Sequence, residues 1–212
     1  TLLNAQTIRI KDIRNILIIS YLGRSGSMLL SNLLDNHTEI LSCPPHSLFK
    51  ASSKIESLID HYSMLPDLTQ DQICTDIVKL FPLLFVSGNH VDILGSKMAK
   101  NSIGAKLETF SFYLKDILQQ NKVSHKSITV NQIFISIHIA YAASLNRKLS
   151  TQKPIIAWQR HYPVSDKDAS RIATIFENPI FITMVRRPEQ AIDAHLVRHL
   201  LEDMDGPEDT IP

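Results

Sequence analysis

The chain has 212 residues, of which 44% are hydrophobic and 20% charged, and its formal net charge is +1. This length suits one α/β domain, the composition is ordinary for a soluble globular protein, and the net charge gives no reason to expect a nucleic-acid or membrane surface. Two cysteines, Cys43 and Cys74, are too few for a disulfide framework and lack metal-ligand spacing. No apolar run approaches the roughly 18 residues of a membrane span, and the N-terminus lacks the pattern of a signal peptide, so we expect a cytoplasmic protein.

The first predicted element is a strand at residues 16–22, an almost continuous apolar run with three isoleucines. Such runs are typical of strands buried on both faces of a parallel sheet. A glycine-containing loop follows at residues 23–27, and leucines recur at helical spacing over residues 28–36. The unpaired backbone N–H groups of the loop and of the first helical turn, together with the helix dipole, predict an anion site at this junction.

The side chains of the loop differ from those of a nucleotide-hydrolase phosphate loop. Met28 occupies the position of the usual lysine, and Arg24 supplies the positive charge instead. The stretch GRSGSMLLSNLLDNH resembles the 5′-phosphosulfate loop of sulfotransferases that use 3′-phosphoadenosine 5′-phosphosulfate (PAPS), especially the carbohydrate and tyrosylprotein types. The resemblance implies that the sulfuryl donor is held, without a metal, by Gly23, Arg24, Ser25, Gly26, Ser27 and Met28. A structural glycine turn in another α/β protein is the alternative.

A second strand is predicted at residues 39–43, where it stops before two prolines that cannot continue a ladder. In doubly wound sheets the ligand lies beyond the carboxyl ends of the strands, so the following residues should face the same crevice as the glycine loop. The tyrosylprotein sulfotransferases carry their catalytic glutamate here, and the matching position in this chain is Pro45. We therefore predict His46 as the general base, with His161 and Glu39 as further candidates.

The middle of the chain is predicted to be a helical insertion in the α/β core. Apolar residues recur at helical spacing in four segments, residues 47–62, 69–85, 102–120 and 130–149. Pro82 should kink or end the second of them. In sulfotransferases the corresponding region shapes the acceptor pocket.

Two further strands are predicted at residues 154–159 and 179–185, separated by a helix at residues 165–177 that Ser165 caps. The first of these strands ends in Arg160 and His161, which are candidates to contact the sulfuryl group or the acceptor, or else a solvated strand end.

The last strand runs into an Arg-x-Pro sequence and a predicted helix. In the sulfotransferases the arginine of this sequence binds the 3′-phosphate of the nucleotide, and the matching residue is Arg186. A serine eight residues later makes a second contact in that family, but this chain has Ala194, which leaves Arg187 or His195 to compensate.

The fold class predicted from these patterns is α/β, a P-loop-like three-layer sandwich with a central parallel sheet and a helical insertion. We expect one sulfotransferase-like domain over residues 1–212, C-terminally incomplete relative to the family. The expected activity is transfer of a sulfuryl group from PAPS to a hydroxyl or amine of a small-molecule, carbohydrate or protein acceptor. The alternatives are a P-loop nucleotide or small-molecule kinase and a non-catalytic binding protein with the sulfotransferase fold.

Overall fold

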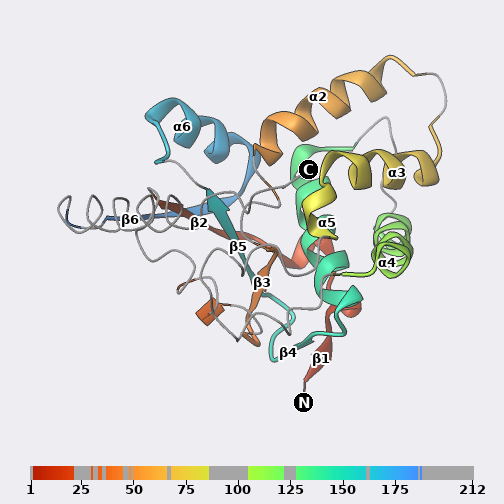
Figure 1. Cartoon of the computed structure of the whole chain (residues 1–212), viewed down its shortest axis with the longest axis horizontal. Coiled ribbons are helices and arrows are strands. Elements are labelled where there is room, and N and C mark those ends of the chain that lie inside the picture. Colours follow the sequence, from red (N-terminus) through yellow and green to blue (C-terminus); the bar gives the residue numbers. More distant parts are fainter. Residues whose placement is uncertain are drawn as a thin grey trace, which may run out of the picture.

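The computed structural model describes residues 2–21, 30, 33–34, 37–44, 48, 50–65, 68–85, 105–121, 128–160, 163–185 and 187. Over these residues the protein is a mixed α/β fold in which helices flank a central four-stranded parallel sheet (Figure 1). No helix in the described ranges combines the length and apolar character needed to traverse a lipid bilayer.

The sheet contains all four predicted strands. They are β2 (Asn15–Tyr21), β3 (Ile40–Ser42), β5 (Ile155–Arg160) and β6 (Asn178–Met184), and their order across the sheet is β3-β5-β2-β6. All three pairings are parallel, so the carboxyl ends of the strands point the same way. The strand of this sheet that comes first in the sequence, β2, therefore lies inside it, between the third and the fourth.

The two faces of the sheet are covered by different parts of the chain. On one face Ile16, Ile18 and Trp158 belong to the main core, which also contains residues of α5 (Val130–Ser144) and α6 (Asp166–Ile175). On the other face Ile19, Ile40 and Ala157 form a smaller cluster, against which Leu30 and Leu34 pack. Leu30 and Leu34 are helical and belong to the segment predicted as a helix after the first strand. The connection from β2 to β3 and the connection from β5 to β6 thus lie on opposite faces.

The helix α5 is the centre of the largest core. Its residues from Ile133 to Ala143 are all buried, because it lies between the sheet and three further helices (Figure 1). These are α2 (Ala51–Ser63), α3 (Gln70–Leu80) and α4 (Leu107–Gln120). All four helices fall between β3 and β5 in the sequence, as the sequence patterns predicted for the middle of the chain.

Local sequence signals explain where these helices begin and end. Thr69 and Thr129 open α3 and α5 through complete capping boxes with a glutamine three residues later. The helix α3 ends at Leu80. Pro82 starts a short 3₁₀ turn, η3 (Pro82–Leu84), a first position at which its missing N–H costs no hydrogen bond.

The prediction that the helix at residues 130–149 continues to residue 149 is wrong. Asn146 has a φ of 54°, and the N–H groups of Asn146 and Arg147 donate to the carbonyls of Ala143 and Ala142. This Schellman arrangement closes α5 after Ser144. The chain then forms β4 (Lys148–Leu149), which pairs antiparallel with β1 (Leu3–Asn4), a pairing too short to be visible in the sequence pattern. Two 3₁₀ turns, η1 (Ala5–Thr7) and η2 (Ile10–Asp12), follow β1.

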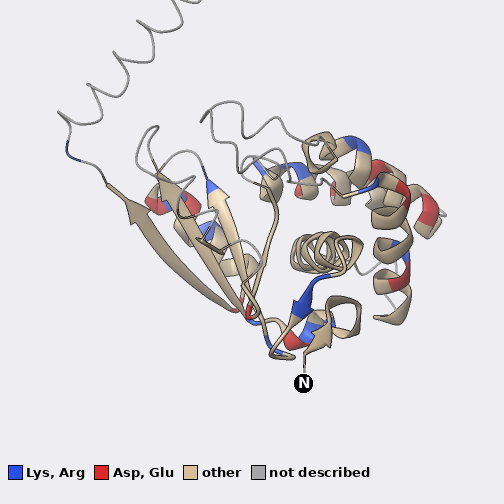
Figure 2. Ribbon diagram, turned by 60° about the horizontal axis from the view of Figure 1, so that its bottom comes forward, with Lys and Arg blue, Asp and Glu red and all other residues tan. Residues whose placement is uncertain are grey.

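The strand β6 forms one edge of the described sheet. Its apolar side chains Ile180, Phe181 and Ile182 are 47%, 40% and 44% exposed. It carries no charged residue, and its ribbon is tan throughout at the left edge of the sheet (Figure 2). The helix predicted after the Arg-Arg-Pro sequence lies outside the described residues.

Candidate functional site

The candidate site is the edge of the sheet at which the parallel strands end, called here the carboxyl edge. It is defined by Tyr21 of β2, Arg160 of β5 and Met184 of β6. Tyr21 and Met184 are direct partners in the β2–β6 ladder. Most residues predicted to bind the donor or act as base follow these strands and β3 in the sequence. The following positions of the predicted site lie outside the described residues: Gly23, Arg24, Ser25, Gly26, Ser27, Met28, His46, His161, Arg186, Ala194 and His195.

A hydroxyl pair joins β2 to β6 one residue before their ends. Ser20 is 1% exposed, and its Oγ lies 2.9 Å from Oγ1 of Thr183. A second contact, at 3.4 Å, runs from the Ser20 hydroxyl to the carbonyl of Ile182. The pair satisfies a buried polar group and ties the two strands together where the predicted anion-binding segments begin. Sequence reasoning missed it, although Ser20 and Thr183 each stand one residue before the end of an apolar strand.

Arg160, the last residue of β5, brings a cationic side chain to the carboxyl edge. In the β2–β5 ladder it is the partner of Ser20, so its side chain lies on the same face of the sheet as the hydroxyl pair. Its guanidinium donates to Oδ2 of Asp168 at 3.1 Å and lies 5.4 Å from the ring centroid of Trp158. The ion pair is 23% exposed on the Arg160 side, so it fixes the guanidinium near the edge without burying its charge.

Asp168 is itself positioned by the start of α6. The Ser165 hydroxyl accepts a hydrogen bond from the backbone N–H of Asp168 at 3.1 Å, which confirms the predicted cap. Because α6 begins within a few residues of the end of β5, its first turn brings the carboxylate back to the strand it follows. Arg160 is therefore held by Asp168 of the helix that follows its own strand. The prediction of a solvated strand end describes Arg160 only in part, because its side chain is partly exposed but paired.

Glu39 can no longer be considered a base candidate at this edge. It precedes β3, and its carbonyl accepts from the N–H of Ile155, the first residue of β5. Glu39 therefore lies at the amino ends of the strands, on the opposite side of the sheet from the carboxyl edge. The sequence did not exclude it, because proximity along the chain to the second strand says nothing about which end of the sheet is involved.

The remaining described candidates are peripheral. Cys43, just after β3, is partly buried and packs against the main core. Arg187 follows β6 by three residues and is exposed, so it remains a candidate to compensate for Ala194.

A neutral histidine lies in the core behind the sheet. His138 of α5 is fully buried, and its Nδ1–H donates a hydrogen bond to the carbonyl of Phe134 at 2.9 Å. The Phe134 ring contacts the rings of both His138 and Trp158, so the imidazole lies one layer behind the carboxyl edge. Burial lowers the pKa of His138 to about 4, because the charged form loses its hydration there. His138 is therefore part of the core.

The described residues contain no group of three or more His, Cys, Asp or Glu side chains able to hold a metal ion. Comparison with known proteins found no matching family model, curated protein or solved structure. The class that the fold and this edge define is thus an α/β protein with a parallel sheet whose strand ends converge on one side.

Proposed function

We propose that this protein is a sulfotransferase that transfers the sulfuryl group of PAPS to a hydroxyl or amine acceptor. The observation that carries the proposal is the parallel pairing of β2 with β6 through Tyr21 and Met184. The two segments that resemble the donor-binding sequences, the GRSGS loop and the Arg-Arg-Pro corner, each follow directly from one of these strand ends. Paired strands lie about 4.8 Å apart, so both segments start from one point of the molecule.

The sheet topology also supports a ligand crevice there. The chain leaves β2 toward one face of the sheet, where Leu30 and Leu34 pack on the smaller cluster. It leaves β5 toward the other face, where Ile172 of α6 belongs to the main core. When neighbouring parallel strands send their connections to opposite faces, the carboxyl ends are left open between them, and ligands of α/β proteins bind in such crevices. This is the arrangement that a P-loop-like sandwich needs.

Chain lengths are compatible with a shared site. Arg24 comes three residues after Tyr21 and Arg186 two residues after Met184, distances of at most about 11 Å and 7 Å along the backbone. The strand β3 stops at Ser42, which is level with Ala157, three residues short of the end of β5. The four residues from Ser42 to His46 span about 13 Å when extended, enough to bring His46 to the level of the carboxyl edge.

In the proposed reaction each group has one role. The backbone amides of Gly26, Ser27 and Met28 and the guanidinium of Arg24 hold the 5′-phosphosulfate and stabilise the departing phosphate. Arg186 binds the 3′-phosphate. His46 takes the proton of the acceptor as a new bond forms to sulfur, while the bond from sulfur to the phosphate oxygen breaks and leaves its electron pair on 3′-phosphoadenosine 5′-phosphate. Such a transfer depends on positioning and charge stabilisation.

Two departures from the family pattern favour a second candidate. Pro45 stands where the tyrosylprotein enzymes have their base, and Ala194 where the family has a serine. A protein with these changes could keep the nucleotide site and lose catalysis, acting as a non-catalytic binding protein. Nucleotide binding without sulfation of any acceptor, in an assay with sugar, phenol and amine acceptors, would favour that candidate.

The proposal is tested by calorimetric titration of the protein with 3′-phosphoadenosine 5′-phosphate. We expect Arg24→Ala to weaken binding at least about 100-fold, because charge-assisted contacts to a buried phosphate are worth several kcal/mol. Arg14→Ala is the matched control: Arg14 precedes β2 at the opposite edge of the sheet, and its partner there is the exposed Glu177. This variant removes the same charge and should bind the nucleotide as the wild type does.

Two results would contradict the proposal. One is unchanged nucleotide affinity in Arg24→Ala. The other is a preference for ATP with Mg²⁺ over the bisphosphate in the same titration, which indicates a kinase.

A further inference from the structure

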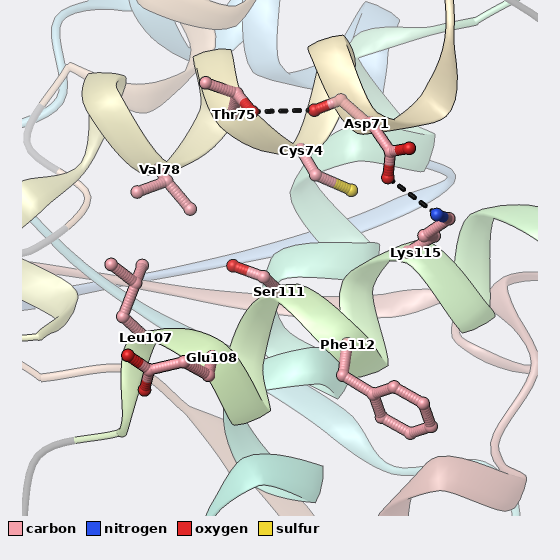
Figure 3. A pocket seen from close by; sticks show the side chains of 9 residues that line it. All are labelled: Asp71, Cys74, Thr75, Val78, Leu107, Glu108, Ser111, Phe112 and Lys115. Carbon is pink, nitrogen blue, oxygen red and sulfur yellow. Dashed lines mark hydrogen bonds and ion pairs between the residues drawn. The ribbon is translucent and has the colours of Figure 1, made fainter.

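A groove between α3 and α4 lies on the far side of α5 from the sheet (Figures 1 and 3). Its volume is about 460 Å³. The two helices run antiparallel along it (Figure 3). Asp71 in the first turn of α3 therefore forms an ion pair with Lys115 in the second half of α4, with Nζ and Oδ1 2.7 Å apart. The groove is remote from the carboxyl edge and plays no part in the proposed transfer.

The walls of the groove are mainly apolar and open to solvent. Val78 and Leu107 line one end, and Phe112 lies on α4 farther along (Figure 3). Phe112 is 66% exposed and Leu107 is 43% exposed, so two large apolar side chains are in contact with water. The Cys74 thiol faces the groove from α3, and burial raises its pKa to about 11, so it remains a neutral, weakly polar surface.

The charges of the groove do not cancel. Lys115 is bound by Asp71, whose hydrogen bond and charge raise the pKa of the lysine. Glu108 is the third charged residue of the lining, and within the described residues its carboxylate has neither an ion-pair nor a hydrogen-bond partner. Glu108 also belongs to the first turn of α4, where its charge complements the helix dipole, but the C-terminal end of α3 lies against the same end of the groove and opposes that effect. The groove therefore has an apolar floor with an excess negative charge at one end.

The dimensions of the groove match a helix. Asp71 and Val78, at its two ends on α3, are seven residues apart, which corresponds to about 10.5 Å along a helix. A partner helix presents apolar side chains at positions i, i+4 and i+7 over the same length, and helix-in-groove recognition uses this spacing. The exposed ring of Phe112 at the rim adds apolar surface that a third helix packed against α3 and α4 would cover.

We propose that the groove between α3 and α4 binds an amphipathic helix of a partner protein that carries apolar anchors at this spacing and a lysine or arginine opposite Glu108. The apolar anchors supply affinity by covering Val78, Leu107 and Phe112. The basic residue pairs with Glu108, so it fixes the direction in which the partner helix lies. The proposal is independent of the sulfotransferase assignment.

The test uses a fluorescein-labelled synthetic helical peptide of about 14 residues, with leucines at the three anchor positions and lysines beside the last anchor. Its fluorescence anisotropy is followed while the full chain is added. We expect a Kd on the order of 10 µM, a loss of at least about tenfold in Glu108→Lys, and recovery when the lysines of the peptide are replaced by glutamates. Phe112 is largely exposed, so its position tolerates a polar side chain. Phe112→Asp should bind both peptides more weakly than the wild type does.

The matched control is Asp60→Lys, which makes the same charge change at an exposed residue of α2 outside the groove. It should leave the affinity for both peptides within twofold of the wild type. The proposal is overturned if the peptide does not bind at 1 mM protein, or if Glu108→Lys and Asp60→Lys weaken it equally. It is also overturned if octylamine displaces the peptide with a Kd as low as that of the peptide itself, because the groove then binds small amphiphilic amines.

Discussion

The strands β2 and β6 have nearly the same kind of sequence and opposite environments. NILIISY and NPIFITM pair residue by residue along their full length. Ile18 of β2 is completely buried, whereas Ile182 of β6 is 44% exposed. The difference arises because β2 has a strand on each side and clusters on both faces, while β6 has one neighbouring strand in the described residues. Burial is therefore set by a strand's position in the sheet, and composition alone does not report it.

The largest expected effect compares one isoleucine from each strand. Ile18→Ala should lower the free energy of unfolding by about 2–5 kcal/mol, because it leaves a cavity in a packed core. Ile182→Ala should cost under about 1 kcal/mol, because water already reaches its side chain. Urea unfolding followed by the fluorescence of Trp158, the single tryptophan, measures both. Equal losses in the two variants would show that β6 is covered in solution.

An intermediate effect concerns His138 of α5, which is buried in the main core on one face of the sheet. Its pKa is about 4 in the folded protein, against an ordinary value of 6.5. The unfolded chain therefore binds a proton at His138 between these values while the folded chain does not, so this contribution to stability is complete above pH 6.5 and is lost as the pH falls toward 4. The loss amounts to about 3 kcal/mol.

Unfolding free energies at pH 7 and pH 4.5 measure this effect. His138→Gln should lose most of the pH dependence attributable to this site, although it destabilises the protein at pH 7. His61→Gln, at an exposed residue of α2, should retain the wild-type dependence. An unchanged pH dependence in His138→Gln would mean that the imidazole is solvated.

The smallest expected effect concerns the hydroxyl pair that joins the two strands. Ser20→Ala and Thr183→Val should each cost about 1 kcal/mol, and the double variant less than the sum, because the two hydroxyls share one hydrogen bond. A double-mutant cycle by urea unfolding gives the coupling energy. Strict additivity would indicate that β2 and β6 are held together by their backbones alone.

Sequence patterns were sufficient to predict all four strands of the sheet and the helices between the second and third of them. Capping residues such as Thr69, Thr129 and Ser165 are local signals, so they predict helix starts well. The end of α5 was misplaced because the apolar pattern runs on past Asn146, whose left-handed backbone stops the helix. Strand order is not local, and so the sequence could not tell that the first and last strands are neighbours.

The candidate site shows the same division. The glycine loop and the Arg-Arg-Pro corner are visible in the sequence because each is contiguous. The Ser20–Thr183 pair and the Arg160–Asp168 pair depend on contacts across strands or between a strand and a helix. Glu39 was retained as a candidate because the sequence does not distinguish the two ends of a strand.

The outer side of β6, which has no partner strand within the described part of the chain, has a consequence for handling the protein. The N–H of Asn178 donates toward β2, to the carbonyl of Arg14, so the outward backbone groups belong alternately to Pro179, Phe181 and Thr183. Proline has no N–H, which leaves two outward donors on a seven-residue strand without any charge to repel another chain. Concentrated preparations should therefore begin to aggregate by pairing at this strand, and Pro179 restricts that pairing to the carboxyl-terminal half of it.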